Sequence, residues 1–358
     1  MNFSDIVNAA ISKDSDRPLM QKESYAVNLP LQQYLEKYKR DILLPITYTE
    51  LFHYSHTNSI KDANGKPTHW ENVVYEKILL DELTPKLLAV YILLNSQENL
   101  SANCLTIKAI DFCEYANSMP FRITVVNSRN DLADFFYIKS ADASRIFGLE
   151  LEQLLSPNQS NFFYHQQTLV EAHIDGVPGD TFLLELNQLS NQEQLLVAEE
   201  FVRFNERCFT RLLGDMRSYN FVVVKNHQGG VPFFRIKAID FDQQCYEGKM
   251  NLYLPQFYKE NYMYVQMISE LLPSKSVEEI RLSESKKLAE LAVKNARRLS
   301  ELLQVMSKEE ISENYKVVSL RKELGTSFHT HRYAKCKTMG ALVKQQLKQL
   351  LHRHLLPS

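Results

Sequence analysis

The sequence predicts an α+β protein in which a small antiparallel sheet is combined with a mainly helical part. Runs of β-branched and aromatic residues at 105–115, 121–127 and 134–139 are separated by turn-rich segments and indicate three strands. A second pair of such runs, 221–224 and 233–239, flanks a Gly-Gly turn and indicates a β-hairpin. Elsewhere apolar residues recur at helical spacing and predict helices.

Length and composition are those of an ordinary globular protein. The chain has 358 residues, enough for two or three domain-sized units, with 44% hydrophobic and 23% charged residues. A net charge of -2 argues against a nucleic-acid-binding protein as a whole, and there is no clear nucleic-acid motif. The five cysteines are scattered and form no C-x-x-C, which favours a reducing compartment and no structural zinc.

The beginning of the chain shows no targeting signal. Residues 1–17 contain no basic region followed by an apolar run, so we expect no signal peptide. No apolar segment approaches the length needed to span a bilayer. Together with the cysteine pattern, these observations predict a cytoplasmic protein without a transmembrane segment.

The first hundred residues are predicted to be a mainly helical extension. Helical spacing of apolar residues suggests a helix at 29–44 and another at 70–95, the second bent near Pro85. Between them, the polar stretch 59–69 reads as a solvent loop with a turn at Asn64 and Gly65. This region carries no interpretable motif.

The predicted hairpin defines a candidate site. Asp215 and Asn220 precede its first strand, and Asp240 follows its second strand. A hairpin brings its two outer ends together, so these three side chains should converge on one edge. Alternatively, Asp215 and Asn220 are only cap and turn residues, a common role of Asp and Asn.

Two motifs here resemble those of the protein-kinase-like phosphotransferase superfamily. The segment GDMRSYNF is similar to its catalytic loop, with Asp215 and Asn220 spaced as in the kinase D-x-x-x-x-N pattern. The segment IDFD, containing Asp240, is similar to its metal-binding motif. The second motif is closer to the atypical and small-molecule branches than to a standard D-F-G.

The resemblance implies a two-lobed protein-kinase-like fold with extensions at both ends. Residues 101–172 would form a small antiparallel-sheet N-lobe and residues 173–272 a helical C-lobe with the catalytic hairpin. Residues 1–100 would be the N-terminal extension, and 273–358 a C-terminal helical extension with a basic end.

The resemblance also implies roles and two cofactors, ATP and Mg²⁺. Asn220 and Asp240 would bind Mg²⁺, and Asp215 would orient or deprotonate the acceptor hydroxyl. Arg217 would be available to the transferred phosphoryl group. Lys139 would be the phosphate-binding lysine, and its partner on the following helix would be Glu150 or, preferably, Glu152. The residues nearest the adenine would be Ala172, His173 and Ile174.

Two departures from the family pattern leave alternatives open. The expected nucleotide loop, 116–120, contains no glycine, and Asp242 replaces the last glycine of D-F-G. Because Asp215, Asn220 and Asp240 are all present, we still expect an ATP- and Mg²⁺-dependent phosphotransferase that modifies a hydroxyl of an unidentified protein, lipid or small-molecule acceptor. The alternatives are a pseudokinase that binds nucleotide or a partner without catalysis, and nucleotidyl transfer at the same site.

The end of the chain is basic. Residues 316–358 contain nine Lys or Arg and one acidic residue, Glu323. In a final helix starting at Thr338, Lys344 and Lys348 fall on the side opposite an apolar face. Such a helix can bind an anionic partner, or it can dock on the protein with its basic side in solvent.

Overall fold

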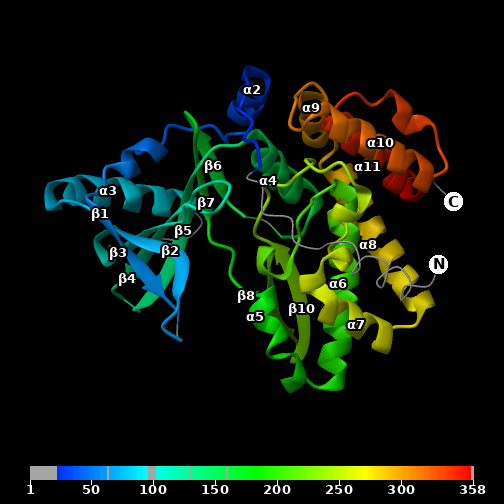
Figure 1. Ribbon diagram of the computed structural model, residues 1–358, viewed down its shortest axis with the longest axis horizontal. Coiled ribbons are helices and arrows are strands. Elements are labelled where there is room, and N and C mark those ends of the chain that lie inside the picture. The colour runs from blue at the N-terminus through cyan, green and yellow to red at the C-terminus, as the bar shows by residue number, and fades with distance from the viewer. Residues whose placement is uncertain (1–21, 63, 96–101, 130, 159, 356–358) are drawn as a thin grey trace. The chain divides into compact units, whose positions relative to one another are not determined.

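The computed structural model describes residues 22–62, 64–95, 102–129, 131–158 and 160–355 (Figure 1). The chain divides into two compact units. The sheet unit contains the described residues up to Ala143 together with Ser160–His173. The helical unit contains 144–158 and the described residues from Ile174 onward. Over the described residues, the chain therefore passes between the two units three times.

The sheet unit is built on a seven-stranded antiparallel sheet. Most neighbouring strands are also neighbours in sequence, apart from an exchange of the last two. In spatial order the strands are β1 (His56–Lys61), β2 (Pro67–Val74), β3 (Leu105–Phe112), β4 (Phe121–Asn127), β5 (Leu132–Ser140), β7 (Thr168–Ala172) and β6 (Phe162–His165). The three strands predicted between residues 105 and 139 are confirmed, and they pair in antiparallel register.

The core of the sheet unit lies between the sheet and helix α3 (Lys77–Leu94), which runs along it in Figure 1. Leu83, Leu87 and Val90 recur at helical spacing on the buried side of α3. Strand β4 contributes Phe121 and Ile123 to the same cluster. A shorter helix, α2 (Leu29–Lys37), precedes the first strand and ends well before residue 44, where the predicted helix stopped.

The region predicted as a mainly helical extension contributes two strands to this sheet. Strands β1 and β2 form a hairpin around Gly65, whose φ of +78° is a conformation that favours glycine. β2 then pairs with β3, with Glu71 opposite Phe112. The turn at Asn64 and Gly65 was predicted, whereas the strands were not. Helix α3 begins later than predicted, at Lys77, and includes Pro85.

The helical unit surrounds helix α6. Helix α6 packs against α7, α8, α11 and strand β10. The helices of this unit are α4 (Ala143–Leu155), α5 (Gly179–Leu183), α6 (Asn191–Arg211), α7 (Tyr262–Leu271), α8 (Ser274–Lys294), α9 (Ala296–Met306), α10 (Asn314–Ser327) and α11 (Met339–Leu355). Its three-stranded antiparallel sheet consists of β10 (Val231–Ala238), β9 (Phe221–Gln228) and β8 (Val177–Pro178).

Helix α6 forms where helical spacing predicted it and fixes the start of the candidate site. A capping box between Ser190 and Glu193 begins it. Phe201, Phe204 and Cys208 are buried, as expected for its apolar side. The helix ends at Arg211, and the next residue, Leu212, has a left-handed φ of +54°. The chain therefore turns sharply into the loop that carries Asp215.

The C-terminal helices dock through apolar faces. The predicted helix 277–306 is two helices, α8 and α9, separated at Asn295. Helix α11 buries its predicted apolar residues, which include Leu342, Leu347 and Leu350, while Lys348 is exposed. An anionic partner for the basic end stays a prediction. Among the described residues, none of the helices combines the length and apolarity that a membrane crossing needs.

Candidate functional site

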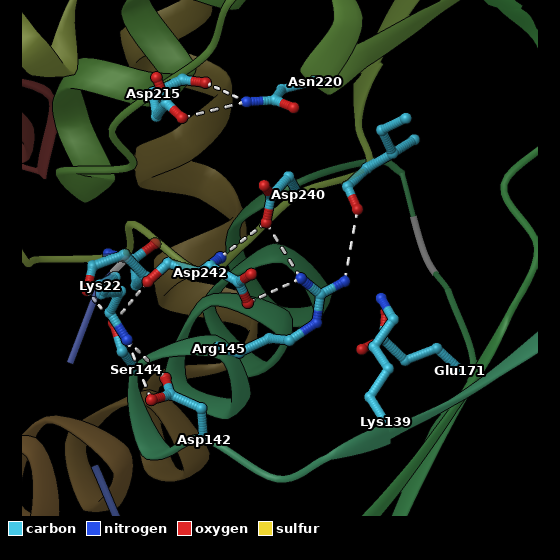
Figure 2. Close-up of polar contacts among 12 residues, drawn as sticks. Lys22, Lys139, Asp142, Ser144, Arg145, Glu171, Asp215, Asn220, Asp240 and Asp242 are labelled. Carbon is cyan, nitrogen blue, oxygen red and sulfur yellow. Dashed lines mark hydrogen bonds and ion pairs between the residues drawn. The ribbon is translucent and has the colours of Figure 1, made fainter. Parts of the chain in front are cut away.

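The hairpin brings Asn220 and Asp240 to the same end of the β9–β10 pair. Phe221 is opposite Ala238, and the Ile239 N–H donates to the Asn220 carbonyl at 3.0 Å. The Asn220 side-chain amide then donates to the Asp215 carbonyl at 2.7 Å and to Asp215 Oδ2 at 3.3 Å. Asp215, Asn220 and Asp240 therefore lie at one edge of the hairpin, with Asp215 and Asn220 in contact and the Asp240 side chain bound to Arg145 and the Asp242 N–H (Figure 2).

The loop that carries Asp215 is held against the chain after Asp240. The Gly214 N–H donates to the Gln243 carbonyl, and the Cys245 N–H donates to the Leu212 carbonyl at 2.8 Å. Asp215 itself has a φ of +56°, which is uncommon for a residue with a side chain. Such conformations persist only where the surrounding structure enforces them, and they cluster at functional sites.

The Asp215 carboxylate is partly buried and charge-paired. Arg217 Nε donates to Asp215 Oδ1 at 2.8 Å. Burial raises the pKa of Asp215, while the hydrogen bond and charge of Arg217 lower it. Arg217 Nη1 also donates to Glu260 at 2.7 Å, so the guanidinium predicted to meet a phosphoryl group is shared by two carboxylates.

The Asp240 carboxylate is held by an arginine. Arg145 Nη1 donates to Asp240 Oδ1 at 3.0 Å and to Asp242 Oδ1 at 2.9 Å (Figure 2). The Asp242 N–H donates to the same Asp240 oxygen at 2.9 Å. Burial and the neighbouring Asp242 charge raise the pKa of Asp240 to about 6, against the lowering effect of Arg145.

Arg145 was not predicted from the sequence. It lies in the first turn of α4 and its side chain is only 2% exposed. Arginine is rarely so buried without a carboxylate partner. An arginine among the apolar residues of a predicted core helix was therefore a sign of a buried ion pair. The sequence does not reveal which carboxylates that arginine contacts.

Lys139 pairs with a strand residue instead of a helix residue. Lys139 Nζ lies 3.1 Å from Glu171 Oε2, and both side chains are buried. Strands β5 and β7 are neighbours, with Tyr137 opposite Glu171 two positions before Lys139. Because residues two apart point to the same face of a sheet, the two charges meet there.

The prediction that Glu152 or Glu150 would pair with Lys139 is therefore corrected. Glu152 forms its ion pair with Arg211 of α6, and Glu150 forms one with Arg298 of α9 at 2.7 Å. Both glutamates are buried in the helical unit. Helical spacing marked them as near the buried side, but it could not show that cations from later helices would meet them.

The residues expected near an adenine ring lie where the chain changes unit. Ala172 ends β7, and His173 Nδ1 is 3.1 Å from the Tyr137 hydroxyl. Ile174 is the first residue after this point in the helical unit. Their role toward a nucleotide stays a prediction.

The loop between β3 and β4 was expected to cover phosphates. The Cys113 N–H donates to the Pro120 carbonyl, and the Met119 N–H donates to the Ala116 carbonyl. The Asn117 side chain accepts a hydrogen bond from the Lys22 N–H at 3.2 Å. Two of the loop's backbone donors are thus used within the loop.

Two oxygens at the hairpin edge are suitable ligands for a hard cation. Asp240 Oδ2 and Asn220 Oδ1 accept no hydrogen bond from any described residue. Carboxylate and amide oxygens are ligands that Mg²⁺ takes, usually completed by phosphates and water. Within the described ranges, no three His, Cys, Asp or Glu side chains are grouped to hold a metal by themselves. The donor set therefore fits Mg²⁺ only when other ligands come from a bound phosphate group.

The five cysteines are free thiols, and four of them are buried. Burial raises the pKa of the Cys208 and Cys245 thiols to about 12. They are therefore not nucleophiles, because the thiolate is the reactive form. Comparison of the chain with protein-family models gives no match, and comparison with curated proteins gives none either.

Proposed function

We propose that this protein is an ATP- and Mg²⁺-dependent phosphotransferase, an atypical member of the protein-kinase-like superfamily. The observation that carries the proposal is the convergence of Asp215, Asn220 and Asp240 at one edge of the β9–β10 hairpin. Asp215 has a left-handed backbone conformation there, and Asp240 Oδ2 and Asn220 Oδ1 are available to a cation. These are the group types that phosphoryl transfer uses for positioning and charge neutralisation.

In the proposed reaction, the chain's own residues bind, orient and accept a proton. Asn220 and Asp240 would hold Mg²⁺, which would neutralise phosphate charge when bound. Asp215 takes the proton from the acceptor hydroxyl while the oxygen of that hydroxyl forms the new bond to the γ-phosphorus. The bond between that phosphorus and the bridging oxygen breaks, and ADP leaves. The raised pKa of Asp215 favours this role, because a base with a higher pKa accepts a proton more readily.

Lys139 is proposed to bind the non-transferred phosphates. Its ammonium group is already paired with Glu171, which fixes its position on β5. Ala172, His173 and Ile174 are proposed to lie near the adenine. The acceptor is a protein, lipid or small molecule with a free hydroxyl, and nucleotidyl transfer at the same site is the variant that the test below separates by its products.

A second candidate is a nucleotide- or partner-binding scaffold without catalysis. The observation in its favour is Arg145, because a buried cation already neutralises Asp240 and Asp242. The loop between β3 and β4 also uses two of its backbone donors internally. In this reading the motif residues stabilise the fold around the hairpin.

A thermal-shift titration with ATP, with and without Mg²⁺, tests both candidates. A ligand that binds only the folded state stabilises it by about 2.7 kcal/mol at one hundred times its Kd. We expect a Mg²⁺-dependent rise in melting temperature that Asp240→Ala abolishes. Asp81→Ala, at an exposed position on α3, is the matched loss of one carboxylate and should keep the rise.

Phosphorus NMR of the same samples decides between catalysis and binding. Release of ADP from Mg²⁺ATP by the wild type, lost in Asp215→Asn, supports the phosphotransferase. Release of pyrophosphate instead would indicate nucleotidyl transfer. A thermal shift without any turnover supports a nucleotide-binding scaffold. No shift with any nucleotide overturns the phosphotransferase and leaves only a partner-binding scaffold.

A further inference from the structure

A short segment before α7 contacts the Asp215 loop at several points. The Tyr258 hydroxyl accepts a hydrogen bond from the Asp215 N–H at 2.9 Å and donates to the Leu252 carbonyl at 2.7 Å. The Asn261 side-chain amide donates to the Met216 carbonyl at 2.8 Å. Tyr258 and Asn261 are buried. The segment thus fixes the backbone of the loop on both sides of the Asp215 peptide.

The same segment supplies a second carboxylate to Arg217. Arg217 donates from Nε to Asp215 and from Nη1 to Glu260, and its guanidinium lies 4.9 Å from the centre of the Tyr258 ring. A guanidinium is planar and rigid, so fixing one of its edges fixes the direction of the other. Glu260 therefore sets the orientation in which Arg217 meets Asp215.

We propose that Glu260 is a positioning residue for Asp215, acting through Arg217, with Tyr258 holding the backbone of the same residue. The proposal rests on the phosphotransferase function proposed above. It assigns the Arg217 guanidinium to the support of the base instead of the transferred phosphoryl group. An Asp215 side chain held in this way is presented to the acceptor hydroxyl in one orientation, which is what proximity catalysis requires.

The first experiment compares wild type and Glu260→Gln by nitrogen NMR of labelled arginine side chains, with Arg217→Lys identifying the Arg217 Nε–H resonance. Exchange of this N–H with solvent should be faster in Glu260→Gln, because the guanidinium is then held by one carboxylate instead of two. Glu270→Gln is the matched control, since Glu270 is exposed on the neighbouring helix α7 and contacts Gln266. It should leave the exchange unchanged. This readout does not require turnover.

The second experiment follows turnover of Mg²⁺ATP, with water as the acceptor. Glu260→Gln should lower kcat by about tenfold to a hundredfold, the size expected from small misplacement of a reacting group. It should leave KM for ATP within twofold. Glu260→Asp should recover part of kcat, because it restores the charge.

Tyr258→Phe provides a variant with a smaller effect on packing. It keeps the ring against Arg217 and removes only the hydroxyl that accepts from the Asp215 N–H. It should lower kcat and leave KM for ATP within twofold. If Glu260→Gln does not fold, Glu260→Asp and Tyr258→Phe decide by the split between kcat and KM.

Unchanged exchange of the Arg217 Nε–H in folded Glu260→Gln overturns this inference and leaves the phosphotransferase proposal intact. An unchanged kcat in an active enzyme does the same. An inactive wild type overturns the proposed function instead. In that case faster exchange of the Arg217 Nε–H still supports the coupling of Glu260 to Asp215, so the two failures are distinguishable.

Discussion

Arg145 donates to Asp240 at 3.0 Å, so a fixed cation already faces the carboxylate proposed to bind Mg²⁺. The contact uses one Asp240 oxygen and leaves the other without a hydrogen bond from the described residues. Arg145 thus has a different effect on each of the two neighbouring carboxylates. It neutralises the buried Asp242, which is 7% exposed, and orients Asp240.

Replacing Arg145 by glutamine should destabilise the protein. Removing one partner of a buried ion pair leaves an uncompensated charge, and the cost is about 3–5 kcal/mol. Urea unfolding at neutral pH measures the loss. Millimolar Mg²⁺ should restore part of it, since a divalent cation can neutralise the Asp240 and Asp242 carboxylates that have lost Arg145. Arg145→Lys keeps the charge and should lose less. Equal stability of Arg145→Gln and wild type would contradict the structural role.

The Mg²⁺-dependent thermal shift should disappear in acid. Mg²⁺ binds the charged carboxylate, and the pKa of Asp240 is about 6, above its ordinary value of 3.8. Because the folded state holds this proton more tightly, the group's stabilising contribution is present below its unfolded pKa. That contribution is lost as the pH rises through about 6. Metal binding follows the opposite direction and is lost as the pH falls through about 6.

A series of melting curves between pH 5 and 8, with and without Mg²⁺ and at fixed ATP, would measure this dependence. Asp240→Asn should show no Mg²⁺ effect at any pH. A Mg²⁺ effect of constant size across the range would exclude Asp240 as the metal ligand.

Lys139→Met should abolish nucleotide-dependent stabilisation. The substitution removes the ammonium group proposed to bind phosphates, and it leaves Glu171 buried beside an apolar side chain. Lys108→Met is the matched control, since Lys108 is exposed on β3 of the same sheet. Binding of a fluorescent ATP analogue measures the difference directly. Unaltered binding by folded Lys139→Met would assign the lysine a purely structural role.

Glu152→Ala should cost far more stability than a surface pair of the same kind. Glu152 meets Arg211, and both side chains are almost fully buried. The expected loss is about 3–5 kcal/mol, because Arg211 is left as an unpaired buried charge. Lys275 and Glu279 form an exposed pair on α8, where Glu279→Ala should cost about 0–1 kcal/mol. Urea unfolding of the two variants compares them, and equal losses would refute the distinction.

The sequence was most informative where a local rule has a consequence in three dimensions. A Gly-Gly turn between two β-type runs defines the β9–β10 hairpin, and a hairpin necessarily joins its outer ends. The position of Asn220 and Asp240 at the same end of the hairpin followed from that rule alone. Helix α6 and strands β3, β4 and β5 were likewise set by periodicity and turn residues.

The missed features depend on contacts between distant segments. Strand β1, with the sequence HTNSIK, is an edge strand with no buried residue, so it has no apolar alternation to reveal it. The partner of Lys139 depended on which strand lies beside β5, and Glu171 is 32 positions away. Tyr258 and Glu260 lie in tight turns that resemble the start of a helix in sequence.

Helix α4 has a consequence for the order in which the chain can fold. It lies between strands of the sheet unit in sequence, yet Glu152 meets a residue 59 positions later and Glu150 one 148 positions later. During synthesis the N-terminal segments emerge first. All seven strands of the larger sheet have emerged once residue 173 has left the ribosome, while both glutamates of α4 still lack their cations. The helical unit can close only after Arg298 has emerged, so most of the chain is made before α4 is fully buried.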